Sequence, residues 1–478
     1  MVEVEVPAQE SEQFRQSTLR QFEETDRQTN EEVQDNENQD ENDEEFFSAM
    51  AEISVEQALS SDDHEEWREA ILSEIKSLIK NETWDIVKKP SDRKVVGCRY
   101  VLTTKLNVDM TTKKKARLVA KGFSQRYGTD YYRTYAPVAR LETIRLLIAL
   151  AVELNLEVHQ LDVNTAYLNG RLDEEVYMQI PKILEESLIT LIQKENANST
   201  VRKRAEKMLV DLEAGGNACL LKRSLYGLKQ AGRQWYIRLD EKLRRMNFKP
   251  TINEPCLYHQ RKEDGTILIV VIYVDDILVA SDNLILIEEF KKDLAAEFEL
   301  QDFGPAKYCL GIEIEKKNGE ICLSQRKYIQ DALKRYSMAD CKTVSTPFVV
   351  GLNFAVPRDH RENDKEKETW PYRELIGTLM YLSVGTRPDI SNTVSKLAQF
   401  TTCLSHTHWI SAKRVLRYLK KTIDYRLTFR KTGKSLIGYS DADWGNCLID
   451  RRSYSGYAFM LGGATISWRS QKQRTVNI

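Results

Sequence analysis

The sequence has no cysteines in a C-x-x-C spacing and no hydrophobic run long enough to cross a membrane. Its eight cysteines are scattered, which favours reduced, structural thiols in an intracellular compartment. Apolar stretches such as "ILIVVIYV" are far shorter than the roughly 20 residues of a transmembrane helix. The N-terminus is acidic, not basic and then apolar, which argues against a signal peptide. We therefore expect neither a disulfide-rich secreted domain nor a membrane protein.

Acidic and basic residues are segregated along the chain. The formal net charge is -2, yet residues 1–66 hold 22 acids and 3 bases, leaving 50 acids and 67 bases in the rest. The rest therefore carries about +17, which favours a polyanionic partner such as nucleic acid. A well-solvated lysine-rich surface would give the same count, so charge alone leaves both interpretations open.

The first 55 residues lack the aliphatic side chains of a core. "NEEVQDNENQDENDEEF" is acidic and polar, so its burial cannot offset the entropy cost of ordering. We predict a disordered acidic leader over 1–55. A helix is expected in "SSDDHEEWREAILSEIKSLIKNETW", because Trp67, Ile71, Ile75, Leu78 and Ile79 fall on one face.

The remaining chain mixes strands and helices without a regular βαβ alternation. A hairpin is expected in "KYCLGIEIEKKNGEICLSQ", with Asn318-Gly319 as its turn. Residues 182–217 are predicted to be a charged, largely helical insertion, and helices dominate from 327 to 422. This mixture predicts an α+β architecture with antiparallel sheets, not a doubly wound fold.

Two adjacent carboxylates interrupt the most apolar part of the chain. Asp275 and Asp276 lie between the two strands predicted in "TILIVVIYVDDILVASD". Aspartates are ordinary residues of a hairpin turn. Beside a buried sheet, however, two carboxylates repel each other and are costly to desolvate. A divalent cation would remove both penalties.

Asp162 is the natural third acid of such a site. It follows the short apolar strand of "EVHQLDV". If this strand lies beside the hairpin, three carboxylates would meet, as two-metal phosphoryl or nucleotidyl transfer requires. Magnesium prefers oxygen ligands and keeps several waters, so a few carboxylates suffice. Spacing alone leaves the metal site and the plain turn as alternatives.

The motifs along the chain resemble a known family. "YVDD" within an apolar hairpin resembles the catalytic motif of reverse transcriptases. Motifs in the order of copia-type LTR retrotransposon Pol polyproteins cover roughly residues 65 to 478: "KKARLVAKGFSQ", "YAPVARLETIRLL", "QLDVNTAYLNG", "SLYGLKQAGRQWY", "CLGIEI", "LIGTLMYLSVGTRPDI", "HWISAKRVLRYLK" and "GYSDADWGNCLIDRRSYSGYAFMLGGATISWRSQKQ".

The resemblance implies an RNA- and DNA-directed DNA polymerase with a right-hand fold and an antiparallel palm sheet. Its domains would be fingers and palm over 56–325, a helical thumb or connection-like region over 326–435, and a truncated ribonuclease H-like β segment over 436–478. The implied partners are an RNA or DNA template with a primer, dNTPs and other polyprotein products, without a membrane. The implied location is cytoplasmic, in virus-like particles, with nuclear entry as an alternative.

The resemblance also implies the catalytic chemistry. Asp162, Asp275 and Asp276 match the catalytic triad, which would hold two Mg²⁺ ions, with Mn²⁺ as an alternative. The primer 3′-hydroxyl would attack the α-phosphate of the dNTP while the ions stabilise the leaving pyrophosphate.

The resemblance further places residues at the incoming nucleotide and the primer. Arg117 in "KARLVAKG" would bind the triphosphate, since a guanidinium can contact phosphate oxygens in pairs. Tyr167 would be an aromatic gate against a ribose 2′-hydroxyl. The "LYGLKQ" turn would line the nucleotide and template through Tyr226, Gly227 and Gln230, and "LGIEI" would grip the primer end through Gly311 and Glu313. An exposed strand arginine and a core tyrosine are the simpler alternatives for Arg117 and Tyr167.

The C-terminal part departs from the family pattern. "GYSDADWG" resembles the first strand of a ribonuclease H domain, with Asp441 as its first acid. The acidic helix and the further aspartate of that domain do not follow, so we predict a vestigial Asp441 and no ribonuclease H activity. The remaining strands should leave an exposed sheet edge. Cys403, His406 and His408 have a faintly zinc-like spacing, but we expect no metal there.

Two function classes follow. The first is a polymerase. The alternative is a catalytically inactive, nucleic-acid-binding remnant of a truncated transposon. The sequence has no D-[ST]-G protease motif, HHCC integrase pattern or C-C-H-C knuckle.

Overall fold

The computed structural model describes residues 53–106, 112–349, 370–445, 447 and 449–475. These residues form two compact units. Unit 1 comprises Met1–Pro137 and Thr165–Lys242, and unit 2 comprises Val138–Asn164 and Leu243–Ile478. The predicted leader, 1–55, lies outside the described residues except for its last three. Within the described residues, no helix has both the length and the apolar character that crossing a membrane requires.

Unit 1 packs helices against two small antiparallel sheets. One sheet is a hairpin of β2 (Cys98–Leu106) and β3 (Thr112–Ala120), and the other has the order β1-β6-β5, from β1 (Trp84–Val87), β6 (Ala218–Arg223) and β5 (Arg171–Met178). Shorter elements are α3 (Val55–Leu59), η1 (Gly122–Ser124) and η2 (Ala166–Asn169). The helix predicted from the spacing of apolar residues is α4 (His64–Lys80), and all five predicted core residues are buried.

The insertion is helical, as predicted, but it is more than a surface addition. It forms α6 (Leu184–Lys194) and α7 (Thr200–Glu213). Leu188 and Ala205 are completely buried in the hydrophobic core of unit 1, together with residues of α4 and β6. The charged residues that dominate the sequence here lie on the outer faces of an amphipathic helix pair, so the segment contributes to the core of its unit.

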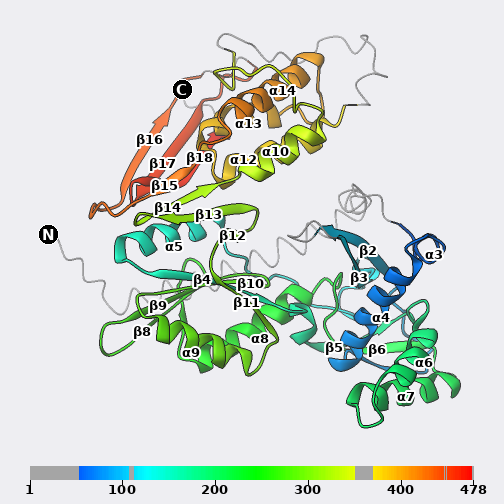
Figure 1. The fold of residues 1–478 in the computed structure, drawn as a ribbon. Coiled ribbons are helices and arrows are strands. Elements are labelled where there is room, and N and C mark those ends of the chain that lie inside the picture. Colours follow the sequence, from blue (N-terminus) through cyan, green and yellow to red (C-terminus); the bar gives the residue numbers. More distant parts are fainter. Residues whose placement is uncertain (1–52, 107–111, 350–369, 446, 448, 476–478) are drawn as a thin grey trace. The chain divides into compact units, whose positions relative to one another are not determined.

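The main sheet of unit 2 has six antiparallel strands in the order β11-β4-β10-β9-β8-β7. They are β4 (Glu157–Val163), β7 (Lys249–Pro250), β8 (Leu257–Arg261), β9 (Ile267–Tyr273), β10 (Asp276–Ser281) and β11 (Leu300–Pro305). Figure 1 shows α5 (Leu141–Leu154) on one face of this sheet and α9 (Leu284–Ala295) on the other. Helix α8 (Ala231–Arg245) spans the boundary between the units along the chain.

Two further sheets and a helical cluster complete unit 2. The sheet β12-β13-β14-β15 is formed by β12 (Tyr308–Cys309), β13 (Ile312–Lys317), β14 (Glu320–Ser324) and β15 (Leu427–Phe429). Asn318 and Gly319 form the predicted turn, both at positive φ. The helices α10 (Arg326–Arg335), α12 (Tyr372–Gly385), α13 (Ser391–Ala398) and α14 (His406–Lys421), with η3 (Pro388–Ile390), share one apolar core.

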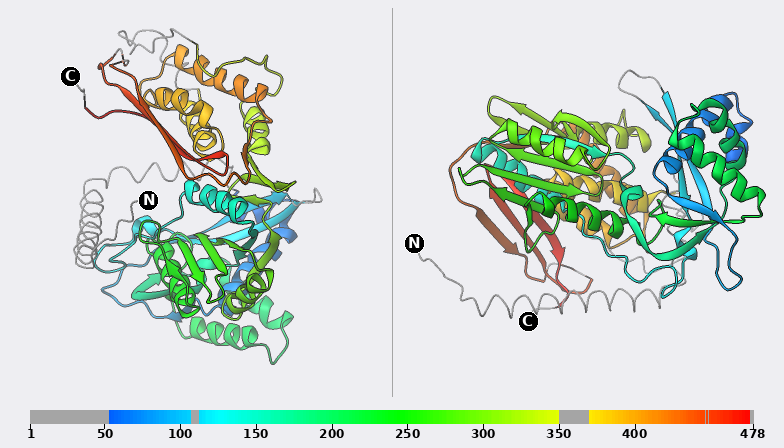
Figure 2. Two further views of the ribbon diagram at one scale, coloured as in Figure 1. Left: turned by 90° about the vertical axis from the view of Figure 1, so that its left-hand side faces the viewer. Right: turned by 90° about the horizontal axis from the view of Figure 1, so that it is seen from below.

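The C-terminal strands β16 (Ile437–Ala442), β17 (Tyr454–Leu461) and β18 (Ala464–Lys472) form a three-stranded antiparallel sheet. In the left view of Figure 2 these red strands lie beside the yellow and orange helices, and β18 contacts α13 and α5. Every residue of β16 is exposed, and this strand pairs only with β17 among the described residues. The exposed sheet edge that we predicted is therefore present.

The compact units differ from the predicted domain boundaries. Residues 138–164 belong with unit 2, because β4 inserts between β10 and β11, strands that follow more than 100 residues later. The regions 326–435 and 436–478, predicted as separate domains, lie in that same unit. The α+β mixture and the antiparallel sheets were predicted correctly.

Candidate active site

Strand pairing brings the three predicted acids together at one end of the main sheet. Asp276, the first residue of β10, is directly opposite Asp162 on β4. Residues directly opposite each other in an antiparallel pair point to the same face. The N–H of Val163 donates to the carbonyl oxygen of Asp275 at 2.9 Å, so Asp275 is also held against β4.

The turn that carries Asp275 has a strained backbone. Tyr273 and Asp276 are paired, so Val274 and Asp275 form a two-residue turn between β9 and β10. Val274 has φ +57°. Such turns favour Gly, Asn or Asp at positive φ, and a β-branched residue there is an outlier. Strain of this kind is characteristic of functional sites, and here it lies directly before the two carboxylates.

The environment of Asp276 opposes its negative charge. Burial is the largest influence and raises the pKa of this carboxyl above its usual value, and the charges of Asp275 and Asp162 raise it further. In the opposite direction, Gln160 Nε2 donates a hydrogen bond of 3.0 Å to Asp276 Oδ1. A cation at this place would be stabilised by the same charges that repel one another.

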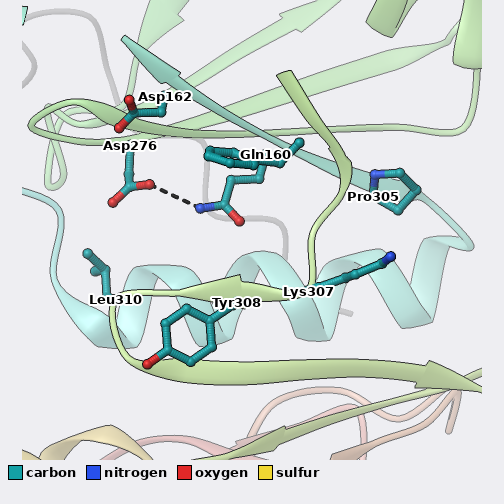
Figure 3. A pocket seen from close by; sticks show the side chains of 8 residues that line it. Gln160, Asp162, Asp276, Pro305, Lys307, Tyr308 and Leu310 are labelled. Atoms are coloured by element: carbon teal, nitrogen blue, oxygen red, sulfur yellow. Dashed lines mark hydrogen bonds between the residues drawn. The ribbon is translucent and has the colours of Figure 1, made fainter. Parts of the chain in front are cut away.

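A cavity of about 420 Å³ opens on this face of the sheet. Figure 3 shows Asp162, Asp276 and Gln160 on one side, with Leu310, Tyr308 and Lys307 across from them. Phe303 and Pro305 complete the lining. Phe303 and Tyr308 are about half exposed, so the cavity combines carboxylates with accessible aromatic rings.

The donor atoms fit a hard divalent cation. Carboxylate oxygens are the ligands that Mg²⁺ and Mn²⁺ prefer, and Asp162 and Asp276 lie opposite each other beside the cavity. Within the described ranges, no three His, Cys, Asp or Glu side chains are arranged as a ready metal site. The carboxylates of Asp162 and Asp276 therefore lie beside the same cavity, while Asp275 belongs to the adjoining turn.

Three predicted substrate residues form a cluster in unit 1. The Arg117 guanidinium lies 4.8 Å from the ring centroid of Tyr226. The rings of Tyr226 and Tyr167 are 4.9 Å apart at 57°. Glu74 lies near this cluster: its Oε1 accepts a hydrogen bond from the Leu118 N–H at 2.9 Å. Burial raises the pKa of Glu74, and the charge of Arg117 works against that increase.

Gly227 allows a close approach between two segments of unit 1. Its φ is +89°, and a Cβ atom here would lie 2.1 Å from the carbonyl oxygen of Ala120. The preceding carbonyl, of Tyr226, accepts a hydrogen bond of 2.8 Å from the Ala120 N–H. The family resemblance implied that this glycine turn lines the nucleotide and template. The structure shows the approach to β3, which places Tyr226 beside Arg117.

Gln230 differs from the prediction that it lines the substrate. Its side chain is completely buried. Its Oε1 accepts from Gln125 Nε2 at 3.0 Å, and its Nε2 donates to the Asp130 carbonyl at 2.8 Å. The amide thus ties the loop that follows β3 to the start of α8, and no part of it is exposed to a nucleotide in this structure.

The predicted primer-end residues lie in the turn and strand next to the cavity. Leu310 and Gly311 both have positive φ and form the turn between β12 and β13. The Tyr381 hydroxyl donates to the Leu310 carbonyl. Glu313 accepts from the Ser324 hydroxyl at 2.7 Å and from the Lys327 N–H at 3.0 Å, at the start of α10. Glu313 thus also has a structural role, because it joins β13 to Ser324 and to the start of α10.

The remaining candidates, Asp441 and His408, lie far from these residues in the sequence and contact other residues. Asp441 is exposed on β16, opposite Gly456. His408 is buried, its ring is stacked 4.0 Å from Phe400, and Nδ1 contacts Ser405. Burial lowers its pKa to about 4. His408 therefore helps to cap α14.

Some functional candidates were missed by sequence reasoning. Gln160 could have been found, because it lies two residues before Asp162 on a strand and so shares its face. Phe303, Lys307 and Tyr308 gave no such signal, because the cavity depends on how β11 and β12 approach β4.

Comparisons with known proteins identify the family of the chain. The family model for reverse transcriptase (RNA-dependent DNA polymerase) matches residues 81–189 and 208–350, slightly more than half of the chain. The chain belongs to the reverse transcriptase family. The gap between the two matched segments, residues 190–207, falls within the α6–α7 insertion.

Several relatives are transposon proteins, and this supports the resemblance to copia-type elements. The chain is 36% identical over 429 residues to a retrovirus-related Pol polyprotein from transposon TNT 1-94 of Nicotiana tabacum, covering 88% of this chain and 30% of that one. It is equally identical to the polyprotein from transposon RE2 of Arabidopsis thaliana, over 86% of this chain and 26% of that protein.

A shorter relative is matched over almost its whole length. A transposon Ty5-1 protein of Saccharomyces cerevisiae is 31% identical, over 66% of this chain and 94% of the relative. Among solved structures, apo telomerase from Candida tropicalis matches 53% of this chain and 59% of its own, with 11% identity and a TM-score of 0.26. That score is too low to carry an argument.

Proposed function

We propose that the chain is an RNA-directed DNA polymerase of a copia-type retrotransposon, which adds dNTPs to a primer on an RNA or DNA template. The observation that carries this proposal is the register that sets Asp276 opposite Asp162, with Asp275 in the adjoining turn. Since the chain spans only 26–30% of the two plant polyproteins described above, the activity of a whole polyprotein is not transferred to it.

The six-stranded sheet of unit 2 is the proposed palm, and unit 1 is the proposed fingers. Helices α10 to α14 are the proposed thumb or connection region. In the palm, Asp162, Asp275 and Asp276 would hold Mg²⁺, which when bound lowers the pKa of the primer 3′-hydroxyl and stabilises the charge on the leaving pyrophosphate. The chain's own contribution is the strand pairing and the strained turn that keep these carboxylates adjacent.

In unit 1, Arg117 would bind the triphosphate and Tyr167 would discriminate against a ribose 2′-hydroxyl. The cation–π contact of Arg117 with Tyr226 supports the first role, because it fixes the planar guanidinium while leaving its N–H groups to contact phosphate oxygens. Contact between the Tyr167 and Tyr226 rings supports the second, because it fixes a flat aromatic surface. Gln230 is proposed only to support the loop.

Gly311 and Glu313 are proposed to place the primer end, since the turn formed by Leu310 and Gly311 adjoins the cavity. The proposed nucleic acid would bind through the excess of basic residues outside the leader. Asp441 lies on a fully exposed strand, and we propose no ribonuclease H role for it.

Primer extension tests the proposed function. The purified chain is given oligo(dT) on poly(rA), with dTTP and Mg²⁺, and incorporation is measured. A DNA template with the same primer and an EDTA-treated reaction are the controls. We expect incorporation on both templates and none in EDTA. A soluble, folded chain that incorporates nothing on either template would contradict the proposal.

The second candidate function is an inactive remnant that binds nucleic acid. It is favoured by the lack of a ready three-ligand metal site within the described part of the chain. Such a remnant would bind the duplex at low salt, with an affinity that falls as salt rises, and would give no extension with Mg²⁺ or Mn²⁺.

A further inference from the structure

Gln160 is placed to act on the carboxylates without being one of them. It precedes Asp162 by two residues on β4 and therefore points to the same face of the sheet. Its side chain lines the cavity beside Asp162 and Asp276 (Figure 3) and is 7% exposed. The polar end of this largely buried amide lies 3.0 Å from Asp276 Oδ1.

The sheet register explains why this contact needs a glutamine. The residue opposite Gln160 on β10 is Leu278, and Asp276 is two positions further along, so the contact is diagonal. On the other side, β11 is bulged and places Gly304 opposite Gln160. A long side chain can cross this space diagonally, and a neutral N–H donor binds a carboxylate oxygen without neutralising its charge.

The proposed function requires that both the backbone and the side chain of Asp276 are held in place. The Val274–Asp275 turn fixes its backbone through the register of β9 and β10. That register leaves the carboxylate free to rotate about its side-chain bonds. Among the described residues, Gln160 is the one whose hydrogen bond fixes an orientation of the Asp276 carboxylate.

We propose that Gln160 is a positioning residue, whose amide holds Oδ1 of Asp276 so that the other carboxylate oxygen is directed to a divalent cation. This inference rests on the proposed function, because it assigns the cation to the reaction. Groups that orient metal ligands are general in metal sites, and their loss typically costs roughly 10- to 100-fold in metal affinity or activity.

Two substitutions remove the hydrogen bond in different ways. Gln160→Met keeps the length and approximate volume of the side chain but has no donor. Gln160→Asn keeps the amide but is one methylene too short for the diagonal contact. Gln301→Met is the matched control, because Gln301 is exposed and lies directly opposite Asp162 on the other side of β4.

Each variant is tested in two ways. The first is the kcat and KM of primer extension, with the duplex Kd and the urea unfolding midpoint measured alongside. The second is Tb³⁺ luminescence of the protein without nucleic acid, with Mg²⁺ added as competitor. The Tb³⁺ titration reports cation binding whether or not the chain is an active polymerase.

We expect Gln160→Met and Gln160→Asn to lower kcat about 10-fold and to weaken cation binding by a similar factor. The KM for dTTP, the duplex Kd and the unfolding midpoint should stay near wild type, as should every property of Gln301→Met. A folded Gln160 variant with wild-type kcat and wild-type Tb³⁺ binding would overturn the inference, as would an equal loss in Gln301→Met.

If Gln160→Met does not fold, Gln160→Asn carries the test. The outcomes also separate this inference from the proposed function. A wild-type chain that fails to extend a primer contradicts the function, while weaker Tb³⁺ binding by the Gln160 variants still supports the hold on Asp276. Extension by the wild type, with unchanged Gln160 variants, contradicts only the inference.

Discussion

Unit 2 places its acids by strand pairing, whereas unit 1 places Arg117, Tyr226 and Tyr167 by ring contacts and a glycine turn. In unit 2 the register of β4 and β10 sets Asp162 opposite Asp276. In unit 1 the Arg117 guanidinium lies 4.8 Å from the centroid of the Tyr226 ring, and that ring lies 4.9 Å from the tilted ring of Tyr167. The arrangement of the acids in unit 2 therefore depends on backbone hydrogen bonds. The arrangement of Arg117 and the two tyrosines in unit 1 depends on side-chain packing. Substitutions should affect the two sites differently.

The largest effect is expected at the acids. Asp162→Asn leaves the strand pairing intact but removes one charge from the carboxylate group. We expect extension to fall on the order of 10³-fold, because a lost metal ligand costs several kcal/mol of transition-state stabilisation. Single-turnover extension measures the fall. Asp293→Asn, an exposed residue of α9, is the control, and a similar fall in it would contradict the site.

The second effect concerns the packing of unit 2 around α5. Arg145 is 4% exposed. It donates to the carbonyls of Ile466, Val384 and Gly385 at 2.7–2.8 Å, and its guanidinium lies 4.0 Å from the ring of Trp468. Burial lowers its pKa to about 10. This side chain joins α5 to β18 and to the C-terminal end of α12.

Arg145→Met should leave buried carbonyls without a donor and destabilise unit 2 by about 3 kcal/mol. Arg145→Lys should recover only part of this, because an ammonium lacks the planar fork of donors. Urea unfolding followed by tryptophan fluorescence measures both. An unchanged midpoint in Arg145→Met would mean that β18 is only loosely attached to α5.

The third effect is expected at the glycine turn of unit 1. Gly227→Ala should destabilise unit 1 by about 2 kcal/mol or more, since it combines a positive φ with a Cβ placed against the Ala120 carbonyl. Gly128→Ala is the matched control: its φ is +79°, but nothing lies within 4 Å of the added Cβ. We expect only the strain cost of about 1 kcal/mol there. Equal losses in the two variants, measured by urea unfolding, would show that the close approach is unimportant.

The smallest effect is expected at Arg117. Arg117→Lys keeps the charge and loses the planar fork, so we expect the KM for dTTP to rise about 10-fold with little change in stability. Steady-state extension at varied dTTP measures the change. An unchanged KM, with an unchanged unfolding midpoint, would return Arg117 to the alternative of an exposed strand arginine.

The sequence predicted the parts of the fold that follow from local periodicity. The buried face of α4 and the Asn318-Gly319 turn both depend on residues near each other in the chain. The buried state of Arg145 was not predicted. Its helix has an apolar stripe in which an arginine does not belong, and its acceptors are more than 200 residues away.

For the site, sequence reasoning found the residue types but not their neighbours. Asp162 and Asp276 were expected to meet, and the register brings them together. Gln230 was expected at the substrate because its motif resembles the nucleotide-lining turn of the family, yet its amide is buried between Gln125 and Asp130. The cavity could not be predicted from the sequence, because it depends on how the segment from Phe303 to Leu310 folds over β4.

The most direct test of the central claim, that the chemistry occurs at the carboxylates of β4 and the β9–β10 turn, is a paired measurement on the variant Asp275→Asn/Asp276→Asn. Extension of oligo(dT) on poly(rA) and the Kd for the same duplex are measured for this variant and for the wild type. We predict that the wild type extends the primer, that the variant does not, and that the variant binds the duplex as tightly as the wild type or more tightly. Extension that survives in the variant would contradict the claim.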